Sequence, residues 1–202
     1  MRLALSVLSR PSKHREAVTW MIRAGLVVAL IAASGLLAPS AFAEPRPSTA
    51  KVGYAIGDSV MLGAKGELKR RGYTVNAAVS RQAYSAPAMV RKRSSSLPRN
   101  VVVHLGTNGT FPLETCKRIV MNAGKSRRVF MLTVAVRRSW ERSNNAVIRR
   151  CAEAFPAGRV TVVDWKALAS RHPSWFYSDG VHLKSAGALG YARLIDGVVS
   201  GG

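Results

Sequence analysis

Two short segments hold residue types that together support nucleophilic chemistry. Gly57-Asp58-Ser59 follows an apolar run and precedes Val60-Met61-Leu62, which is typical of a helix start. A serine on a tight turn between a strand and a helix projects its hydroxyl from the top of a sheet. Asp179 and His182 lie three residues apart near the end of the chain. A hydroxyl, an imidazole and a carboxylate are the nucleophile, base and orienting group of acyl transfer through a covalent ester.

Each of these residues also has an ordinary structural interpretation. Ser59 alone would serve as a helix cap. Asn108, in the turn Gly106-Thr107-Asn108-Gly109, would satisfy backbone groups. Asp179 and His182 would be ordinary loop residues. Their joint occurrence, with the last pair just before a C-terminal helix, favours the catalytic interpretation.

Apolar runs alternate with amphipathic stretches along the chain. Strands are predicted at residues 52–57, 74–79, 101–105, 128–134 and 160–163. Helices are predicted at residues 60–71, 84–93, 112–124, 142–155 and 184–199. This alternation predicts an α/β fold, a five-stranded parallel sheet covered by helices on both faces as a three-layer α/β/α sandwich. Ser59, Ser80 and Asn108 each follow a strand, so the sheet is expected to gather them at one edge.

Four blocks in this order resemble the SGNH (GDSL-type) hydrolase family. They are Gly57-Asp58-Ser59, Val79-Ser80-Arg81-Gln82, Gly106-Thr107-Asn108-Gly109 and Asp179-Gly180-Val181-His182-Leu183. Gly-Asp-Ser-Val-Met-Leu-Gly-Ala, and Trp-Phe-Tyr before the last block, are most similar to the extracytoplasmic domains of bacterial polysaccharide and peptidoglycan O-acetyltransferases. The resemblance implies a flavodoxin-like fold and an enzyme that acts on acyl esters.

The resemblance also assigns roles. Ser59 is the expected nucleophile, His182 the general base and Asp179 the residue that orients His182. The expected oxyanion hole consists of the Ser59 backbone N–H, the Ser80 backbone N–H and the Asn108 side-chain amide. The family usually has glycine at the position of Ser80, and a serine adopts positive φ less readily. This departure puts the geometry of that donor in question.

Further residues carry weaker expectations. Arg81 is expected to flank an anionic substrate, and Trp140 to line the cleft together with Arg137 or Arg138, with simple packing as the alternative for Trp140. His104 lies between apolar residues and is expected in the core. The sequence has no His, Cys, Asp or Glu spacing typical of a metal site and no glycine-rich nucleotide loop, so we expect no metal and no cofactor.

The N-terminus has the pattern of an export signal. Residues 24–38 are apolar, basic residues precede them, and Ala41-Phe42-Ala43 matches the small-x-small cleavage rule. Met21 is an alternative start, and an uncleaved membrane anchor is the competing interpretation. The expected organisation is a signal peptide at 1–43, a linker at 44–50 and an SGNH hydrolase domain at 51–202.

The charge is strongly basic. The formal net charge is +21, and residues 44–202 contain 26 basic and 9 acidic residues. For an exported protein we expect anionic wall polymers, anionic lipids or acidic glycans as partners rather than nucleic acid. A solvated basic surface without a partner is the equally weighted alternative.

Two cysteines remain, Cys116 and Cys151, each on a predicted helix. An oxidising compartment and an even count favour a disulfide over two buried free thiols. Neither cysteine has the glycine-turn context of a catalytic thiol.

The expected function is a secreted or periplasmic, cell-wall-associated serine esterase that removes O-acyl groups, acetyl above all, from an envelope carbohydrate. The first alternative is an O-acetyltransferase that uses the same site and receives acetyl from a separate membrane acyltransferase. The second alternative is an inactive basic wall-binding module. A monomer is expected.

Overall fold

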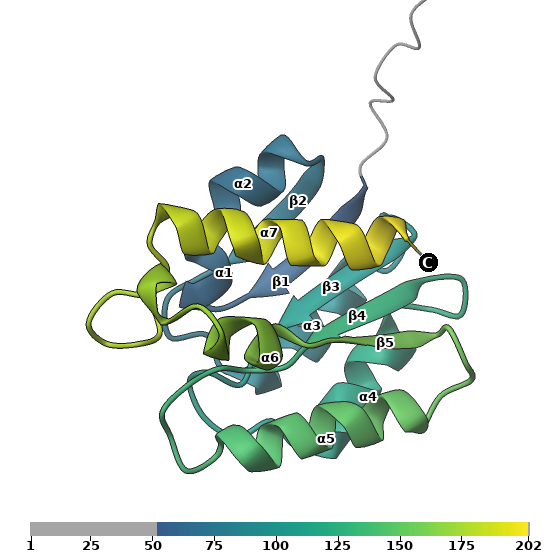
Figure 1. Cartoon of the computed structure of the whole chain (residues 1–202). Coiled ribbons are helices and arrows are strands. Elements are labelled where there is room, and N and C mark those ends of the chain that lie inside the picture. The colour runs from purple at the N-terminus through teal and green to yellow at the C-terminus, as the bar shows by residue number, and fades with distance from the viewer. Residues whose placement is uncertain (1–51, 202) are drawn as a thin grey trace, which may run out of the picture. The chain divides into compact units, whose positions relative to one another are not determined.

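The computed structural model describes residues 52–201, so the predicted signal peptide and linker lie outside the described residues. Its sheet has five parallel strands in the order β2-β1-β3-β4-β5 (Figure 1). The strands are β1 (Gly53–Gly57), β2 (Tyr73–Ala77), β3 (Asn100–His104), β4 (Arg128–Leu132) and β5 (Val160–Val163). This strand order is flavodoxin-like and confirms the predicted fold class.

Helices cover both faces of the sheet because each central strand is apolar on both sides. On one face, α3 (Ala86–Lys92), α4 (Leu113–Asn122) and α5 (Glu141–Glu153) pack against side chains such as Val101 and Val103. On the other, α1 (Ser59–Gly63), α2 (Lys65–Arg70), α6 (Trp165–Ser170) and α7 (Ser185–Ser200) pack against Val102 and Phe130. In Figure 1, α7 and α6 lie in front of the sheet and α3 and α4 behind it.

Two features of the helices differ from the sequence prediction. The predicted helix at 60–71 is two short helices, because Ala64 ends α1 and begins α2. The helix α6 was not predicted. Asp164 caps its N-terminus by accepting a hydrogen bond from Ala167 N at 3.1 Å. Two short 3₁₀ turns, η1 (Ala83–Ser85) and η2 (Pro173–Trp175), complete the described elements.

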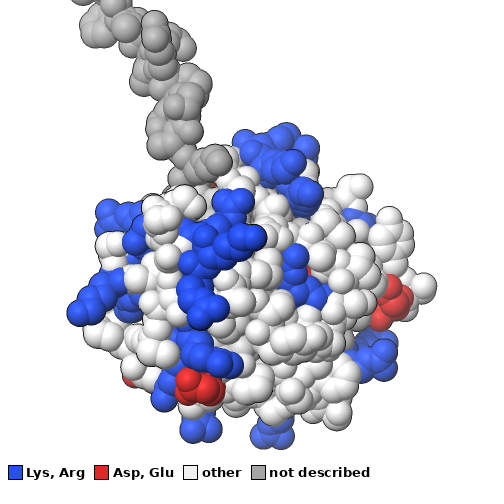
Figure 2. Space-filling model, turned by 180° about the vertical axis from the view of Figure 1, so that it is seen from behind, with Lys and Arg blue, Asp and Glu red and all other residues white. Residues whose placement is uncertain are grey.

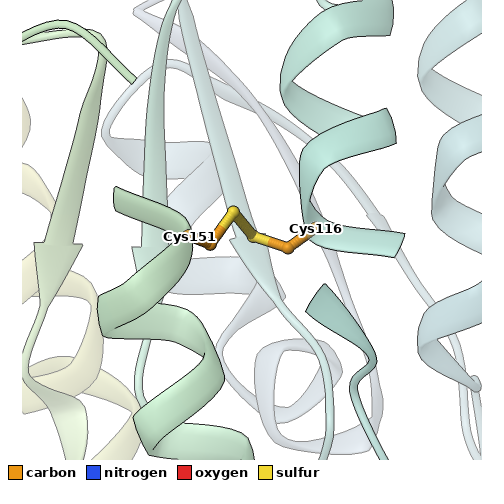
Figure 3. The surroundings of a disulfide bond; sticks show 2 residues. All are labelled: Cys116 and Cys151. Carbon is orange, nitrogen blue, oxygen red and sulfur yellow. A yellow bond between two sulfur atoms is a disulfide. The ribbon is translucent and has the colours of Figure 1, made fainter. Parts of the chain in front are cut away.

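A disulfide joins Cys116 on α4 to Cys151 on α5, as predicted (Figure 3). Both residues are fully buried in the core beneath these helices. Because the bond closes a long loop, it restricts the unfolded chain and stabilises this layer.

The surface carries the basic excess expected from the composition. Figure 2 shows many lysine and arginine side chains, and few acidic ones, on the face seen from behind Figure 1. Residues 52–201 contain 24 basic and 8 acidic residues. Among these residues, no helix has the length and hydropathy needed to cross a lipid bilayer.

Candidate active site

The turn after β1 presents Ser59 at the carboxyl edge of the sheet. Asp58 caps α1, because its Oδ1 accepts a hydrogen bond from Val60 N at 3.0 Å. A Cβ at Gly57 would lie 2.4 Å from Cβ of Met61, so only glycine allows α1 to pack this closely on the strand end. Ser59 is therefore the first residue of α1, and the start of this helix is held both by the Asp58 cap and by the packing of Met61 on Gly57.

His182 and Asp179 come from the loop before α7 and meet Ser59 across 123 positions of sequence. His182 Nε2 lies 3.1 Å from Ser59 Oγ, and His182 Nδ1 lies 2.7 Å from Asp179 Oδ2. With Nδ1–H donating to the carboxylate, Nε2 is free to accept the serine proton. The structure thus brings together the three residues that the sequence predicts as nucleophile, general base and the residue that orients the base.

Asp179 is fixed by three hydrogen bonds. Its Oδ1 accepts from Val181 N at 2.8 Å and from His182 N at 2.9 Å, while Oδ2 faces the imidazole. The hydrogen bond from His182, supported by these two amides, lowers the pKa of Asp179 to about 2. The carboxylate is therefore ionised at every pH at which an esterase is ordinarily assayed.

Two further polar groups reach the same edge from neighbouring strands. Ser80 lies three residues after β2, and Asn108 lies four residues after β3. Both line a cavity of about 330 Å³ together with Ser59, Asp179 and His182. Its other lining residues are Val79, Thr107, Val136, Arg137, Arg138 and Val181.

No family model matches the chain. Curated relatives do: the chain is 34% identical to the peptidoglycan O-acetyltransferase OatA of Listeria monocytogenes over 150 residues, which are 72% of this chain and 24% of that protein. The chain thus spans about a quarter of the length of such relatives.

Solved structures agree with this likeness. The C-terminal catalytic domain of Streptococcus pneumoniae peptidoglycan O-acetyltransferase A superposes with a TM-score of 0.65 and 28% identity, over 75% of this chain and 94% of that domain. A GDSL-like lipase from Bacteroides thetaiotaomicron shares the fold, with a TM-score of 0.55 and 18% identity over 73% of this chain and 87% of that one.

The chain belongs to the SGNH (GDSL-type) hydrolase family. Within it, the chain is similar to the C-terminal SGNH domains of peptidoglycan O-acetyltransferases, and it is an enzyme of the class that acts on acyl esters.

The SGNH domain accommodates serine in its second block at a cost in backbone strain. Ser80 has φ of +55°, and it is the sole non-glycine residue with positive φ between residues 52 and 201. An L-residue in the left-handed region is less stable there by about 1–2 kcal/mol. Strain of this kind persists where the surrounding structure determines the backbone, as it does at many functional sites.

The loop that carries Asn108 is held by a residue that sequence reasoning missed. Asn144 of α5 is only 2% exposed. Its Nδ2 donates to Gly106 O at 2.9 Å and to Gly109 O at 2.8 Å, and its Oδ1 accepts from Phe111 N at 2.8 Å. One side chain therefore satisfies the backbone on both sides of Asn108. The available sequence signal was spacing: Asn144 precedes Ile148 by four residues and Cys151 by seven, which places it on the apolar face of α5.

Arg81 does not face the cavity of the SGNH domain, and its expected role beside the substrate is not supported. Its guanidinium donates to Gly57 O at 3.1 Å, to the Asn76 carbonyl oxygen, and to Asn76 Oδ1 at 2.9 Å. The carbonyl oxygens at the ends of β1 and β2 draw the side chain toward the sheet. Arg81 therefore ties the Ser80 loop to the strand that precedes Ser59.

Trp140 is also absent from the cavity wall. It is partly buried and immediately precedes α5, where its carbonyl oxygen accepts from Asn144 N at 2.9 Å. The structure thus favours the packing alternative for this residue. Arg137 and Arg138, its expected companions, do line the cavity.

A buried polar cluster adjoins the turn that carries Ser59, where Asp58 N donates to His104 O at 3.2 Å. His104 is fully buried, as predicted, and its Nδ1 lies 2.8 Å from Oη of Tyr191. Burial lowers the pKa of His104, although the nearby Asp58 carboxylate opposes the effect. Burial also raises the pKa of Tyr191, and Asp58 adds to that rise. Both rings are therefore neutral in the folded SGNH domain.

Proposed function

We propose that Ser59 is the nucleophile of this SGNH domain and that it forms an acyl-serine intermediate. One observation carries the proposal: Ser59 Oγ, the His182 ring and the Asp179 carboxylate form a continuous chain with separations of 3.1 and 2.7 Å. Oγ bonds to the ester carbonyl carbon while its proton moves to His182 Nε2. The tetrahedral intermediate then collapses, the bond from the carbonyl carbon to the donor's leaving group breaks, and His182 gives the proton to that group. In the second half, a sugar hydroxyl or water attacks the acyl-serine, His182 takes the attacking group's proton, and Ser59 Oγ leaves and recovers that proton from His182.

The developing oxyanion requires donors that are already in place. The Ser59 and Ser80 backbone N–H groups and the Asn108 side-chain amide fill this role in the proposal. Ser80 and Asn108 line the cavity that Ser59 enters, which supports the assignment. Losing one such donor typically lowers turnover by a factor of about 10²–10³.

We propose that the carbohydrate is a cell-envelope polymer, with peptidoglycan as the leading candidate. Its O-acetyl group would be the product of transfer or the substrate of hydrolysis. The likeness to O-acetyltransferase domains favours transfer of acetyl from Ser59 to a sugar hydroxyl over hydrolysis, which reverses the order expected from the sequence. In this proposal a membrane acyltransferase supplies the acetyl group.

Hydrolysis remains the second candidate for a specific reason. The side chains of His182 and Asp179 are 51% and 48% exposed, so water reaches the base that activates the second nucleophile. Transfer therefore requires the acceptor glycan itself to cover this side of the site and exclude water.

We further propose that the domain acts outside the cytoplasm as a monomer, after removal of residues 1–43. The basic excess within residues 52–201 would then concentrate it on anionic wall polymers through long-range attraction. Salt would release such a complex, since screening weakens attraction between exposed charges.

The test combines a chromogenic acetyl ester with a peptidoglycan-derived glycan as acceptor. We expect wild-type protein to carry one acetyl group on Ser59 under single-turnover conditions and to pass it to the glycan or to water. Acetylated glycan identifies the transferase, and free acetate alone identifies the esterase. Ser59→Ala should lower turnover by at least about 10³-fold. Ser94→Ala, an exposed serine outside the cavity, is the matched control.

Turnover by Ser59→Ala equal to that of Ser94→Ala would refute the mechanism. Absence of any acyl-enzyme, combined with tight binding to wall polymers, would instead support the inactive wall-binding alternative.

A further inference from the structure

Two adjacent arginines stand at the mouth of the Ser59 cavity. Arg137 and Arg138 lie in the loop between β4 and α5, and both are exposed. Over residues 52–201, neither guanidinium has a hydrogen bond or an ion pair. They are the two residues of the lysine and arginine type among the described lining of this cavity.

The acidic side chains closest to them are committed elsewhere. Glu141 Oε2 accepts from Val136 N at 2.7 Å, and Glu141 Oε1 pairs with Lys166 Nζ at 2.8 Å. Asp179 is the one acidic residue among the described lining of the cavity, and it is bound to His182 and to two backbone amides. The cavity wall therefore carries two positive charges that no carboxylate of the described chain neutralises.

The same contacts hold the loop in place. The Glu141 bond fixes Val136, and Arg138 N donates to Val136 O at 2.8 Å. Arg137 passes over Gly180, where an added Cβ would lie 3.6 Å from Arg137 Nε. A second cavity of about 250 Å³ begins beyond it and shares Val136 and Arg137 with the first. Arg137 thus stands between the space beside Ser59 and a neighbouring space.

We propose that Arg137 and Arg138 form an anion subsite that binds a carboxylate on the carbohydrate substrate, close to the acylated hydroxyl. The inference rests on the proposed function and narrows its substrate to acidic sugars. A guanidinium presents two parallel N–H donors that match the two oxygens of a carboxylate. Because the two exposed arginines are adjacent, either of them can bind the carboxylate in this bidentate way. The carboxylate would sit between the two cavities while the acetyl carbonyl carbon faces Ser59 Oγ.

Lactyl-ether sugars and uronic acids both carry such a carboxylate. The probes are therefore 6-O-acetyl-N-acetylmuramic acid and an O-acetylated galacturonide, each compared with its methyl ester, which removes the negative charge. The readout is the ratio of kcat/KM for the acid to kcat/KM for its methyl ester. A residue with a merely structural role would lower both values and leave the ratio unchanged.

We expect the wild-type protein to favour at least one acid over its methyl ester. Arg137→Gln and Arg138→Gln should each lower that ratio by about tenfold, the effect of losing one charged hydrogen bond. Arg137→Lys should retain part of the preference for the acid, because lysine keeps the positive charge but cannot form the bidentate pair of hydrogen bonds. Arg142→Gln is the matched control, since this exposed arginine of α5 lines neither cavity and its loss changes the net charge equally. The acid that shows the effect identifies the sugar class.

A ratio near one in the wild type, or an equal fall in Arg142→Gln, would overturn the subsite while leaving the proposed function intact. Preference for a glycerol phosphate ester over both acids would overturn the assignment to a carboxylate. Calorimetric binding of the unacetylated acids and their methyl esters gives the same comparison without turnover. Binding selectivity in a protein that forms no acyl-enzyme would retain the subsite and reject the proposed mechanism.

Discussion

Asn144→Ala tests whether α5 positions the proposed oxyanion donor Asn108. The substitution removes three hydrogen bonds of 2.8–2.9 Å from a site that is 2% exposed, and it leaves two carbonyl oxygens and one N–H without their partner. At about 0.5–1.5 kcal/mol for each bond, the free energy of unfolding should fall by about 2–4 kcal/mol. The released loop moves Asn108, and a displacement of about 1 Å costs up to 10²-fold in turnover.

Asn145→Ala is the matched control for this prediction. Asn145 is the next residue of α5, and its side chain bonds Val134 N at 2.7 Å and Val134 O at 2.9 Å rather than the backbone of the Asn108 loop. We expect a loss of about 1–3 kcal/mol in stability with little change in kcat. The two variants therefore separate general destabilisation from displacement of the donor.

The assay measures urea unfolding and steady-state hydrolysis of a chromogenic acetyl ester for Asn144→Ala, Asn108→Ala and the double variant. If Asn144 acts through Asn108, the double variant loses no more turnover than Asn108→Ala alone, a clear failure of additivity. Additive losses, or a kcat for Asn144→Ala equal to that of Asn145→Ala, would refute the reasoning.

Three other predictions concern stability. Replacing both Cys116 and Cys151 with alanine should lower the free energy of unfolding by about 4 kcal/mol in the chain-entropy model, because the bond spans 35 positions. Urea unfolding of the oxidised wild type and of the variant measures this difference. Ser80→Val should destabilise by about 1–2 kcal/mol whereas Ser80→Gly should not, since φ is positive there; thermal unfolding of the pair decides. Burial lowers the pKa of His104, so as the pH falls the unfolded chain binds a proton at this residue before the folded chain does. The free energy of unfolding should therefore drop by up to about 1.4 kcal/mol per pH unit below about pH 6.5. Unfolding compared at pH 7.5 and pH 5 measures this drop, which should be smaller in His104→Gln.

The fold was predictable because its signals are local. Runs such as Val101-Val102-Val103 predict strands buried on both faces, and their alternation with helices predicts a parallel sheet. The α6 helix was missed because it is only six residues long, although Asp164 before it is a typical cap. The break at Ala64 had a sequence signal that the prediction overlooked, since Gly63 and Gly66 stand on either side of it and glycine disfavours a continuous helix.

The site was predictable where a residue type itself implies the chemistry. Ser59, Asp179 and His182 are such residues, and the structure brings them together. Arg81 was misplaced because its sequence position next to Ser80 does not reveal the direction of a long side chain. Asn144 was missed because a polar residue within a helix is ordinarily solvent-facing, and only the packed structure shows it buried.

Each proposed oxyanion donor has its own anchor in the scaffold. Asp58 caps the helix that begins at Ser59, Arg81 ties the Ser80 loop to β1 and β2, and Asn144 brackets Asn108. The three anchors come from three separate segments, but they are linked: Arg81 donates to Gly57 O, next to Asp58, and Arg81 O accepts from Asn108 Nδ2 at 3.5 Å. Substitutions at Arg81 and at either of the other anchors should therefore depart from additivity, as should those at an anchor and its own donor. Preorganised donors are effective because they need no rearrangement during the reaction, so residues that never contact the substrate fix the geometry on which catalysis depends.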